Sequence, residues 1–227
     1  MLKKLYMGER SQYPRWRDEK GNFVGLSRIL RNGTRAFATG LCRVMLARRP
    51  RLPWISYDAI SYFKSHLNKN SVVLEFGSGM STIWYARHSA KVYSVEDNAE
   101  GGGRWYQQMS DQFDHLGITN VQYLLAKSKA EYINFGMHLN TKFDLIMVDG
   151  SFRSECVANS LNLLADGGFF YLDNSDKHSG PDGGDTREAE RLLTDFANSN
   201  GFKTTYFTDF APTQFFVQQG LLVQAAL

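Results

Sequence analysis

Short apolar runs alternate along most of this chain with segments whose apolar residues recur every three or four positions. Five runs have the continuous apolar character of buried parallel strands, at residues 72–76, 91–96, 121–125, 143–149 and 169–173. Helical spacing appears in apolar stripes over residues 59–67, 157–164 and 189–196. The alternation predicts consecutive strand–helix units and therefore a parallel sheet with helices on both faces.

The end of the chain departs from this pattern. Two apolar runs, residues 203–207 and 214–217, are joined by residues 208–213, a connection too short for a crossover helix. These two runs should therefore pair antiparallel. The whole pattern predicts an α/β fold of three layers, in which an antiparallel C-terminal hairpin closes a doubly wound, mostly parallel, seven-strand sheet.

The first predicted strand ends in a carboxylate and opens at once into a glycine turn, Glu75-Phe76-Gly77-Ser78-Gly79-Met80-Ser81-Thr82. Glycine suits a sharp strand-to-helix reversal, because it adopts positive φ and lets a ligand approach the main-chain N–H groups. A dinucleotide fingerprint would need a third glycine at position 82, which is Thr82. The turn therefore predicts a nucleotide-like cofactor and disfavours NAD.

A second acidic residue, Glu96, ends the next predicted strand, 21 residues after Glu75. An acid at about this distance is placed to hydrogen-bond the two hydroxyls of a ribose. Asp149 and Asp173 end two later runs, and ligands of open α/β sheets bind outside the carboxyl ends of the strands. These polar strand ends predict one ligand site at that edge of the sheet.

The acidic-x-Gly-x-Gly turn, Glu96 and the order of elements over residues 55–219 resemble class I S-adenosylmethionine-dependent methyltransferases. The resemblance implies S-adenosylmethionine as cofactor, with the glycine turn at its methionine end and Glu96 at its ribose. Ser128 follows the third strand, where many relatives hold the adenine amino group. The cofactor residues that the resemblance implies are Glu75, Gly77, Ser78, Gly79, Ser81, Thr82, Glu96, Ser128 and Asp149.

The residues after the fourth and fifth predicted strands indicate the acceptor chemistry. Methyltransferases of base amino groups carry an Asx-Pro-Pro-aromatic segment there, which the residues after Asp149 do not match. Asp149 and Asp173-Asn174 are instead similar to the three oxygen ligands with which metal-dependent O-methyltransferases hold Mg²⁺. The resemblance thus implies a Mg²⁺ site at Asp149, Asp173 and Asn174, with an ordinary polar turn as the alternative.

The proton acceptor for such a reaction departs from that family. Its members place a lysine three residues after the first metal aspartate, and this chain has Phe152 there, followed by Arg153. Asp149, or His178 in the loop after the fifth strand, is able to act as the catalytic general base. Arg153 is able to pair either with an acidic acceptor or with a neighbouring carboxylate.

Composition and charge divide the chain. Its 227 residues, 43% hydrophobic and 14% aromatic, suffice for one substantial core. The net charge is only +3, but residues 1–53 contain 13 Lys and Arg against 3 acids, and residues 54–227 contain 13 against 20. We therefore expect a basic, partly helical N-terminal extension over residues 1–53 and a methyltransferase domain over residues 54–227.

Three roles fit the basic extension. Helical pieces are expected over residues 27–31 and 35–49, with a break near residues 32–33. In the first role the extension packs on the domain, with solvated arginines outside, through its apolar stripe of Phe37, Leu41, Val44 and Met45. In the second it is an interfacial helix on anionic lipid. The third, nucleic-acid binding, is disfavoured, because no recognisable motif is present.

Cysteine usage and the start of the chain indicate the compartment. Cys42 and Cys156 lack metal-ligand spacing and are expected as small buried hydrophobic residues in a reducing cytoplasm. No apolar run follows the charged first residues, which predicts a cytoplasmic protein, peripheral at the inner membrane surface if the extension binds lipid.

The preferred function is O-methylation of a small-molecule or glycan-like acceptor, with S-adenosylmethionine as the methyl donor. One alternative is a nicotinamide-dependent oxidoreductase on the same sheet, which Thr82 disfavours. The other is a non-catalytic module that keeps the cofactor fold and docks through its basic N-terminus.

Overall fold

The computed structural model describes residues 13–46, 50–99, 101–178 and 183–226, and its centre is a seven-stranded sheet. The strand order is β3-β2-β1-β4-β5-β7-β6, and β7 runs antiparallel to both of its neighbours. The bounds are β1 Val72–Phe76, β2 Lys91–Asp97, β3 Val121–Ala126, β4 Phe143–Val148, β5 Leu164–Leu172, β6 Lys203–Ala211 and β7 Gln214–Gln224. The predicted α/β sheet with its C-terminal hairpin is confirmed.

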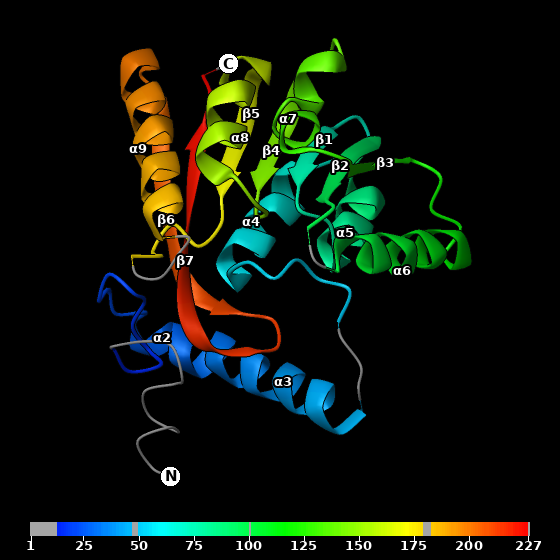
Figure 1. Ribbon diagram of the computed structural model, residues 1–227. Coiled ribbons are helices and arrows are strands. Elements are labelled where there is room, and N and C mark those ends of the chain that lie inside the picture. Colours follow the sequence, from blue (N-terminus) through cyan, green and yellow to red (C-terminus); the bar gives the residue numbers. More distant parts are fainter. Residues whose placement is uncertain (1–12, 47–49, 100, 179–182, 227) are drawn as a thin grey trace.

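Helices cover both faces of the sheet (Figure 1). One face carries α4 (Tyr57–His66), α5 (Met80–His88) and α6 (Gly102–His115), and the other carries α7 (Lys129–Ile133), α8 (Arg153–Ser160) and α9 (Gly183–Asn200). Successive strand residues point to opposite faces. Leu145 and Met147 of β4 therefore pack with α4 and α5, whereas Ile146 and Val148 pack with α7, α8 and α9.

The C-terminal hairpin is longer than its apolar runs predict, and it extends beyond the rest of the sheet toward α3 (Figure 1). Residues 208–211, expected as a connection, continue β6, and only Pro212 and Thr213 remain in the turn. The added strand residues include buried polar side chains, among them Asp209 and Gln218, which are hydrogen-bonded. A search for apolar runs does not detect strands of this kind.

One continuous helical segment replaces the two predicted N-terminal pieces. α2 (Leu26–Arg28) passes through a π-helical turn, η1 (Ile29–Gly33), into α3 (Thr34–Leu46), so the break expected near residues 32–33 is wrong. The wider turn coincides with a close approach to the hairpin. Asn32 donates Nδ2 to Oδ2 of Asp209 (2.5 Å), and a Cβ on Gly33 would lie 3.3 Å from Phe210.

This helical segment docks on the hairpin through small and polar residues. Ala36 is fully buried, and the hydroxyl of Thr39 accepts a hydrogen bond from the backbone N–H of Thr213 (2.9 Å). The apolar stripe that was expected to pack on the domain instead faces outward, with exposed fractions of 57% for Phe37, 47% for Leu41, 83% for Val44 and 70% for Met45. The expected packing orientation is therefore wrong.

The arginines of the segment reach back toward the domain. Arg28 and Arg31 both form ion pairs with Asp58 at the start of α4 (2.5 and 2.6 Å). The guanidinium of Arg35 lies 4.3 Å from the ring centroid of Tyr57. The arginines therefore contact α4 from the edge of the helix, and Arg28 and Arg31 remain 45% and 64% exposed.

The two cysteines differ in their surroundings. Cys156 is buried, as expected, whereas Cys42 is exposed on α3, which corrects the expectation that it is buried. Within the described ranges, no helix combines the length and the apolar character that crossing a membrane requires.

Candidate functional site

The glycine turn after β1 touches the turn after β4 at the carboxyl edge of the sheet. Gly77 has φ +95°, and a Cβ there would lie 2.9 Å from the backbone of Gly150. A Cβ on Gly150 would lie 2.0 Å from the hydroxyl of Tyr132. Gly79 is extended, with φ 173°, so positive φ is needed at Gly77 alone. Backbone contact between the two turns leaves room for no side chain at positions 77 and 150.

Glu75 is buried beneath this turn and holds it to the first turn of α5. Its carboxylate accepts hydrogen bonds from the hydroxyls of Ser81 (2.5 Å), Thr82 (2.6 Å) and Ser94 (2.7 Å). Burial raises the pKa of Glu75 to about 7, although the three donors act in the opposite direction. The hydroxyl of Thr82 also accepts from the N–H of Gly79 (3.0 Å). Glu75, Ser81 and Thr82 thus form the frame of the turn.

Glu96, near the end of β2, reaches the same turn from the neighbouring strand. Its Oε2 accepts hydrogen bonds from the backbone N–H (3.0 Å) and the hydroxyl (2.5 Å) of Ser78. The hydroxyl of Ser78 also lies 2.5 Å from that of Tyr123 in β3. Burial raises the pKa of Glu96, while the bonds from Ser78 lower it. The structure therefore joins Ser78 and Glu96, which were predicted separately.

Three aromatic residues outside the predicted set surround this pair. The indole N–H of Trp105, in α6, donates to the carbonyl of Ser78 (3.1 Å). Tyr106 stacks on Tyr123 with their ring centroids 4.4 Å apart. Tyr123 was detectable from its place in the third strand. Trp105 and Tyr106 gave no signal, because aromatic residues in an amphipathic helix are more often part of a core.

The second group of predicted residues comes together around Arg153. β4 and β5 are neighbouring parallel strands, so Asp149 and Asp173 leave the sheet side by side. Nη2 of Arg153 lies 3.4 Å from Oδ1 of Asp149 and 3.3 Å from Oδ1 of Asn174. The guanidinium also donates to the carbonyls of Gly150 (3.1 Å), Asp149 (3.3 Å) and Asp173. The sequence allowed Arg153 to pair with an acidic acceptor or with a neighbouring carboxylate. In the structure it pairs with the neighbouring carboxylate of Asp149.

Two of the four non-glycine residues with positive φ in the described ranges belong to this group. Phe152, which precedes α8, has φ +51°, and Asn174 has φ +49°. Asparagine tolerates this left-handed region, but a phenylalanine there costs on the order of 1 kcal/mol or more. The ring of Phe152 packs edge-on against Tyr132 and beneath the ammonium of Lys129, 4.7 Å from the ring centroid. These contacts hold the strained turn that aims Arg153 at the strand ends.

The two carboxyls of the group differ in electrostatic environment. Burial raises the pKa of both, and that of Asp173 most strongly, with the charge of Asp149 as a further cause. Asp173 is 2% exposed, and its Oδ1 has no hydrogen-bond partner in the described part of the chain. The charge of Arg153 opposes the rise in the pKa of Asp149. Asp149 is therefore the more readily ionised of the two.

The three predicted metal ligands lie together, but a guanidinium already stands among them. Mg²⁺ binds oxygens at about 2.0–2.1 Å, so an ion on Asp149 and Asn174 would crowd the like charge of Arg153. Arg153 is 6% exposed and is held by three backbone carbonyls. The described ranges contain no cluster of three or more His, Cys, Asp or Glu suited to a metal. The arrangement does not fit Mg²⁺ while Arg153 is in place, and the magnesium site stays a prediction from sequence.

Two predicted site residues have other surroundings. Ser128 is exposed and caps α7, where its hydroxyl accepts from the backbone N–H of Glu131 (3.2 Å). His178 is exposed, and its backbone contacts are with Glu19 (3.1 Å) and Arg187. It lines a pocket of about 330 Å³ formed by the N-terminal segment, α9 and β6. The structure therefore does not place His178 in the group around Asp149.

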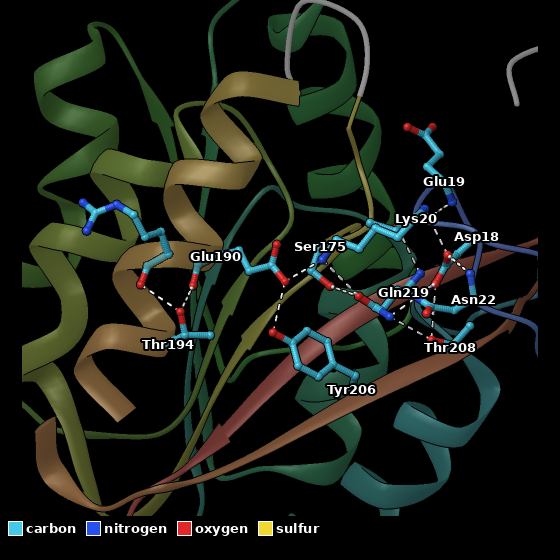
Figure 2. A network of polar contacts seen from close by, with 12 residues as sticks. Asp18, Glu19, Lys20, Asn22, Ser175, Glu190, Thr194, Tyr206, Thr208 and Gln219 are labelled. Carbon is cyan, nitrogen blue, oxygen red and sulfur yellow. Dashed lines mark hydrogen bonds and ion pairs between the residues drawn. The ribbon is translucent and has the colours of Figure 1, made fainter. Parts of the chain in front are cut away.

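The loop that follows Asn174 is hydrogen-bonded to the N-terminal segment around Glu19 and to β7 at Gln219 (Figure 2). The backbone N–H groups of Glu19 and Gln219 donate to the two oxygens of Asp176 (3.1 and 3.0 Å). Ser175 donates its N–H to the carbonyl of Gln219 (2.8 Å). Burial raises the pKa of Asp176 to about 6. The position of the strand-five loop thus depends on the N-terminal segment and on β7.

Comparison with known proteins gives matches in structure only. No protein-family model and no curated protein sequence matches the chain. An O-methyltransferase from Bacillus cereus, solved with SAH, matches with a TM-score of 0.60 at 14% identity, over 84% of this chain and 90% of that one. The O-methyltransferase TomG from Streptomyces achromogenes, solved with SAM, matches with 0.58 at 15%, over 85% and 89%.

An RNA-modifying enzyme has the same architecture. An rRNA methylase from Streptococcus thermophilus matches with a TM-score of 0.54 at 16% identity, over 74% of this chain and 93% of that one. At such identities the likeness shows the fold alone. The chain therefore has the seven-stranded fold of class I methyltransferases, as the sequence resemblance implied, and the acceptor must be argued from its own residues.

Proposed function

We propose that this chain is an S-adenosylmethionine-dependent methyltransferase. One observation carries the proposal: Glu96 and Ser78 are hydrogen-bonded where the glycine turn meets the end of β2, with Tyr123 and Trp105 beside them. An acid, a glycine turn and aromatic rings at the carboxyl edge of a parallel sheet suit a nucleoside with a charged tail.

The proposed cofactor contacts are assigned according to which polar groups of the site already form hydrogen bonds within the chain. Glu96 bonds Ser78 through Oε2, so its Oε1 is assigned to the ribose hydroxyls. Trp105 and Tyr106 are assigned to the purine, because flat aromatic faces stack on it. Glu75 already accepts three hydroxyl hydrogen bonds and acts as the frame of the turn. The main chain of residues 77–79 is left for the methionine end.

The proposed reaction is methylation of an acceptor hydroxyl on a small molecule or a glycan. The cofactor brings a methyl group on a positively charged sulfur. The acceptor oxygen bonds to the methyl carbon while the carbon–sulfur bond breaks, and the hydroxyl proton passes to Asp149. Asp149 is assigned as the base because Arg153 favours its ionised form, whereas its neighbour Asp173 is favoured in the protonated form. Alignment of the acceptor oxygen behind the methyl carbon supplies much of the acceleration.

Cofactor identity is tested by calorimetric titration with S-adenosylhomocysteine and, separately, with NAD. We expect binding of S-adenosylhomocysteine and none of NAD. Glu96→Gln should weaken the affinity by roughly 10- to 100-fold, because a charged hydrogen bond to ribose is lost. Glu188→Gln, a charge-matched change on the exposed surface of α9, should leave it unchanged. Binding of NAD alone would instead favour the oxidoreductase.

Acceptor class is tested by transfer of a labelled methyl group to separate pools of hydroxyl-bearing small molecules, glycans and ribosomal RNA. We expect label in a hydroxyl-bearing pool and its loss with Asp149→Asn, while S-adenosylhomocysteine still binds. Label in RNA alone would contradict the proposed acceptor but not the proposed cofactor. Binding without transfer to any pool would favour a non-catalytic module.

A further inference from the structure

The outward faces of η1 and α3 and the adjoining start of β7 form one exposed apolar surface. Six of the thirteen large hydrophobic side chains exposed in the described ranges make up what we call the α3 surface: Leu30, Phe37, Leu41, Val44, Met45 and Phe215. Apolar patches of this kind on a protein surface mark sites of interaction. Figure 1 shows α3 at one edge of the molecule, away from the helices that cover the sheet.

The orientation of the helix is fixed, so the α3 surface cannot turn inward. A Cβ on Gly33 would lie 3.3 Å from Phe210, and one on Gly40 would lie 3.5 Å from the carbonyl of Thr213. These small residues, with Ala36 between them, allow the helix to lie close against the hairpin. A rotation that buried the apolar stripe would bring large side chains into that narrow interface, where they do not fit.

The hairpin extends the apolar surface beyond the helix. The ring of Phe215 meets that of Phe37 edge-on, with centroids 5.7 Å apart. Along the helix, Phe37, Leu41 and Val44 follow one another at spacings of four and three residues, so they share one face. The α3 surface is therefore a continuous stripe rather than a set of scattered side chains.

Positive charge flanks this stripe. Residues 26–46 contain four arginines and no acidic residue. Arg28 and Arg31 share the single carboxylate of Asp58, so their summed charge is not neutralised there. Arg43 lies over the ring of Trp54, 5.4 Å from its centroid, and donates to the hydroxyl of Thr213. The sequence continues with arginines at positions 48, 49 and 51.

We propose that the α3 surface binds the surface of an anionic lipid bilayer. A rigid helix with an apolar stripe between basic flanks inserts the stripe at the level of the headgroups and sets the arginines against lipid phosphates. A second copy of the chain would bring the same basic flanks together with no acid on the segment to pair them. RNA would neutralise the arginines but leave the apolar stripe in water.

Sedimentation with vesicles tests the proposal on the full chain, without cofactor or acceptor, so its outcome is independent of the proposed function. Wild type should sediment with vesicles of phosphatidylcholine mixed with phosphatidylglycerol, should not sediment with phosphatidylcholine alone, and should bind less at high salt. Val44→Gln with Met45→Gln should lower the partition coefficient by roughly tenfold or more. Met137→Gln, at an exposed apolar residue of η2 (Phe135–His138), is the matched control and should bind as wild type.

Cys42 offers a second readout on the same helix. It is exposed, whereas Cys156 is buried, so a polarity-sensitive fluorophore should attach at Cys42 alone. Its emission should shift to shorter wavelength on addition of the anionic vesicles and not on addition of neutral ones. The shift reports insertion at this helix even if the double variant proves difficult to purify.

Several outcomes would overturn the proposal. They are failure to sediment with anionic vesicles at low salt, equal loss of binding in the Met137→Gln control, and an unchanged emission spectrum at Cys42. A stable dimer in sedimentation equilibrium that the Val44 and Met45 changes dissociate, without vesicle binding, would assign the surface to a second copy. Binding to RNA that the same two changes leave intact, without vesicle binding, would assign the basic flanks to nucleic acid.

Discussion

Oδ1 of Asp149 lies 3.4 Å from Nη2 of Arg153, so a fixed positive charge stands beside the carboxylate that we assign as the base. Burial raises the pKa of Asp149, and Arg153 acts against that rise. The chain thus supplies from one of its own side chains the positive charge that a divalent ion would otherwise bring to these oxygens.

Replacement of Arg153 should reduce stability substantially. Arg153→Met removes the donor to three backbone carbonyls and takes the guanidinium charge away from Asp149 and from the buried Asp173. Losses of this kind cost about 3–5 kcal/mol, which urea-induced unfolding would measure. Arg153→Lys keeps the charge but loses the planar guanidinium group. Its free energy of unfolding should therefore lie between those of wild type and Arg153→Met. Equal stability of all three proteins would show that the contacts of Arg153 are not maintained in solution.

The same residue predicts how the protein responds to metal ions. Wild type should bind neither Mg²⁺ nor Mn²⁺ at this site, and methyl transfer should be unaffected by EDTA, because Arg153 stands where the ion would bind. Arg153→Met should gain Mn²⁺ binding, observed by electron paramagnetic resonance, which Asp149→Asn in the same chain should abolish. Stoichiometric Mn²⁺ binding by wild type, lost on changing Asp149, would restore the magnesium site that the sequence implies.

Gly150 should tolerate no larger residue. Gly150→Ala sets a Cβ 2.0 Å from the hydroxyl of Tyr132 and 3.1 Å from Gly77, and the overpacking should cost about 1–3 kcal/mol in unfolding free energy. Addition of Tyr132→Phe removes the nearest clashing atom and should recover most of that loss. Gly184→Ala is the control, since its Cβ would meet nothing closer than 4.0 Å. A Gly150→Ala protein as stable as wild type would contradict the close approach of the two turns.

Glu75 should give the stability a pH dependence. Its pKa rises from 4.5 to about 7 on folding, because it is buried. Between these values the folded protein keeps a proton that the unfolded chain releases, so stability falls as the pH rises from about 4.5 to 7, by at most roughly 3 kcal/mol. Below pH 4.5 Glu75 does not make the free energy of unfolding depend on pH. Above pH 7 its whole stabilising contribution has been lost.

Glu75→Gln isolates this effect. The amide stays neutral, and the three hydroxyl partners are able to rotate so that one accepts from it. Relative to wild type, the variant should therefore gain stability as the pH rises from 4.5 to 7, in unfolding curves measured at several pH values. Parallel pH profiles for the two proteins would show that Glu75 does not titrate in this window.

The central sheet was predictable because buried parallel strands are apolar throughout and end in polar residues at one edge. The outer parts were not. Asp209 lies in a strand but is polar, and its partner Asn32 is far away in the sequence. Arg153 is buried only because Phe152 takes a left-handed conformation, which no local pattern indicates. These features depend on contacts between residues far apart in the chain, and the local pattern of a single sequence does not predict such contacts.

The face on which a helix packs was the least predictable feature. The apolar stripe of α3 was assigned to the core, which is the general rule for amphipathic helices. Gly33, Ala36 and Gly40 form an equally regular series on the neighbouring side of the helix, and the hairpin packs closely against that side. Small residues at helical spacing were thus the signal that the sequence offered for the true interface.

The contacts between α3 and the hairpin also constrain how the molecule is assembled. Asn32 bonds a residue 177 positions later, and Thr39 bonds one 174 positions later. During synthesis on the ribosome, α3 therefore has no hairpin to dock on until β6 and β7 have emerged. The strands that fix α3 are thus translated long after it, and their interface is among the later contacts to form.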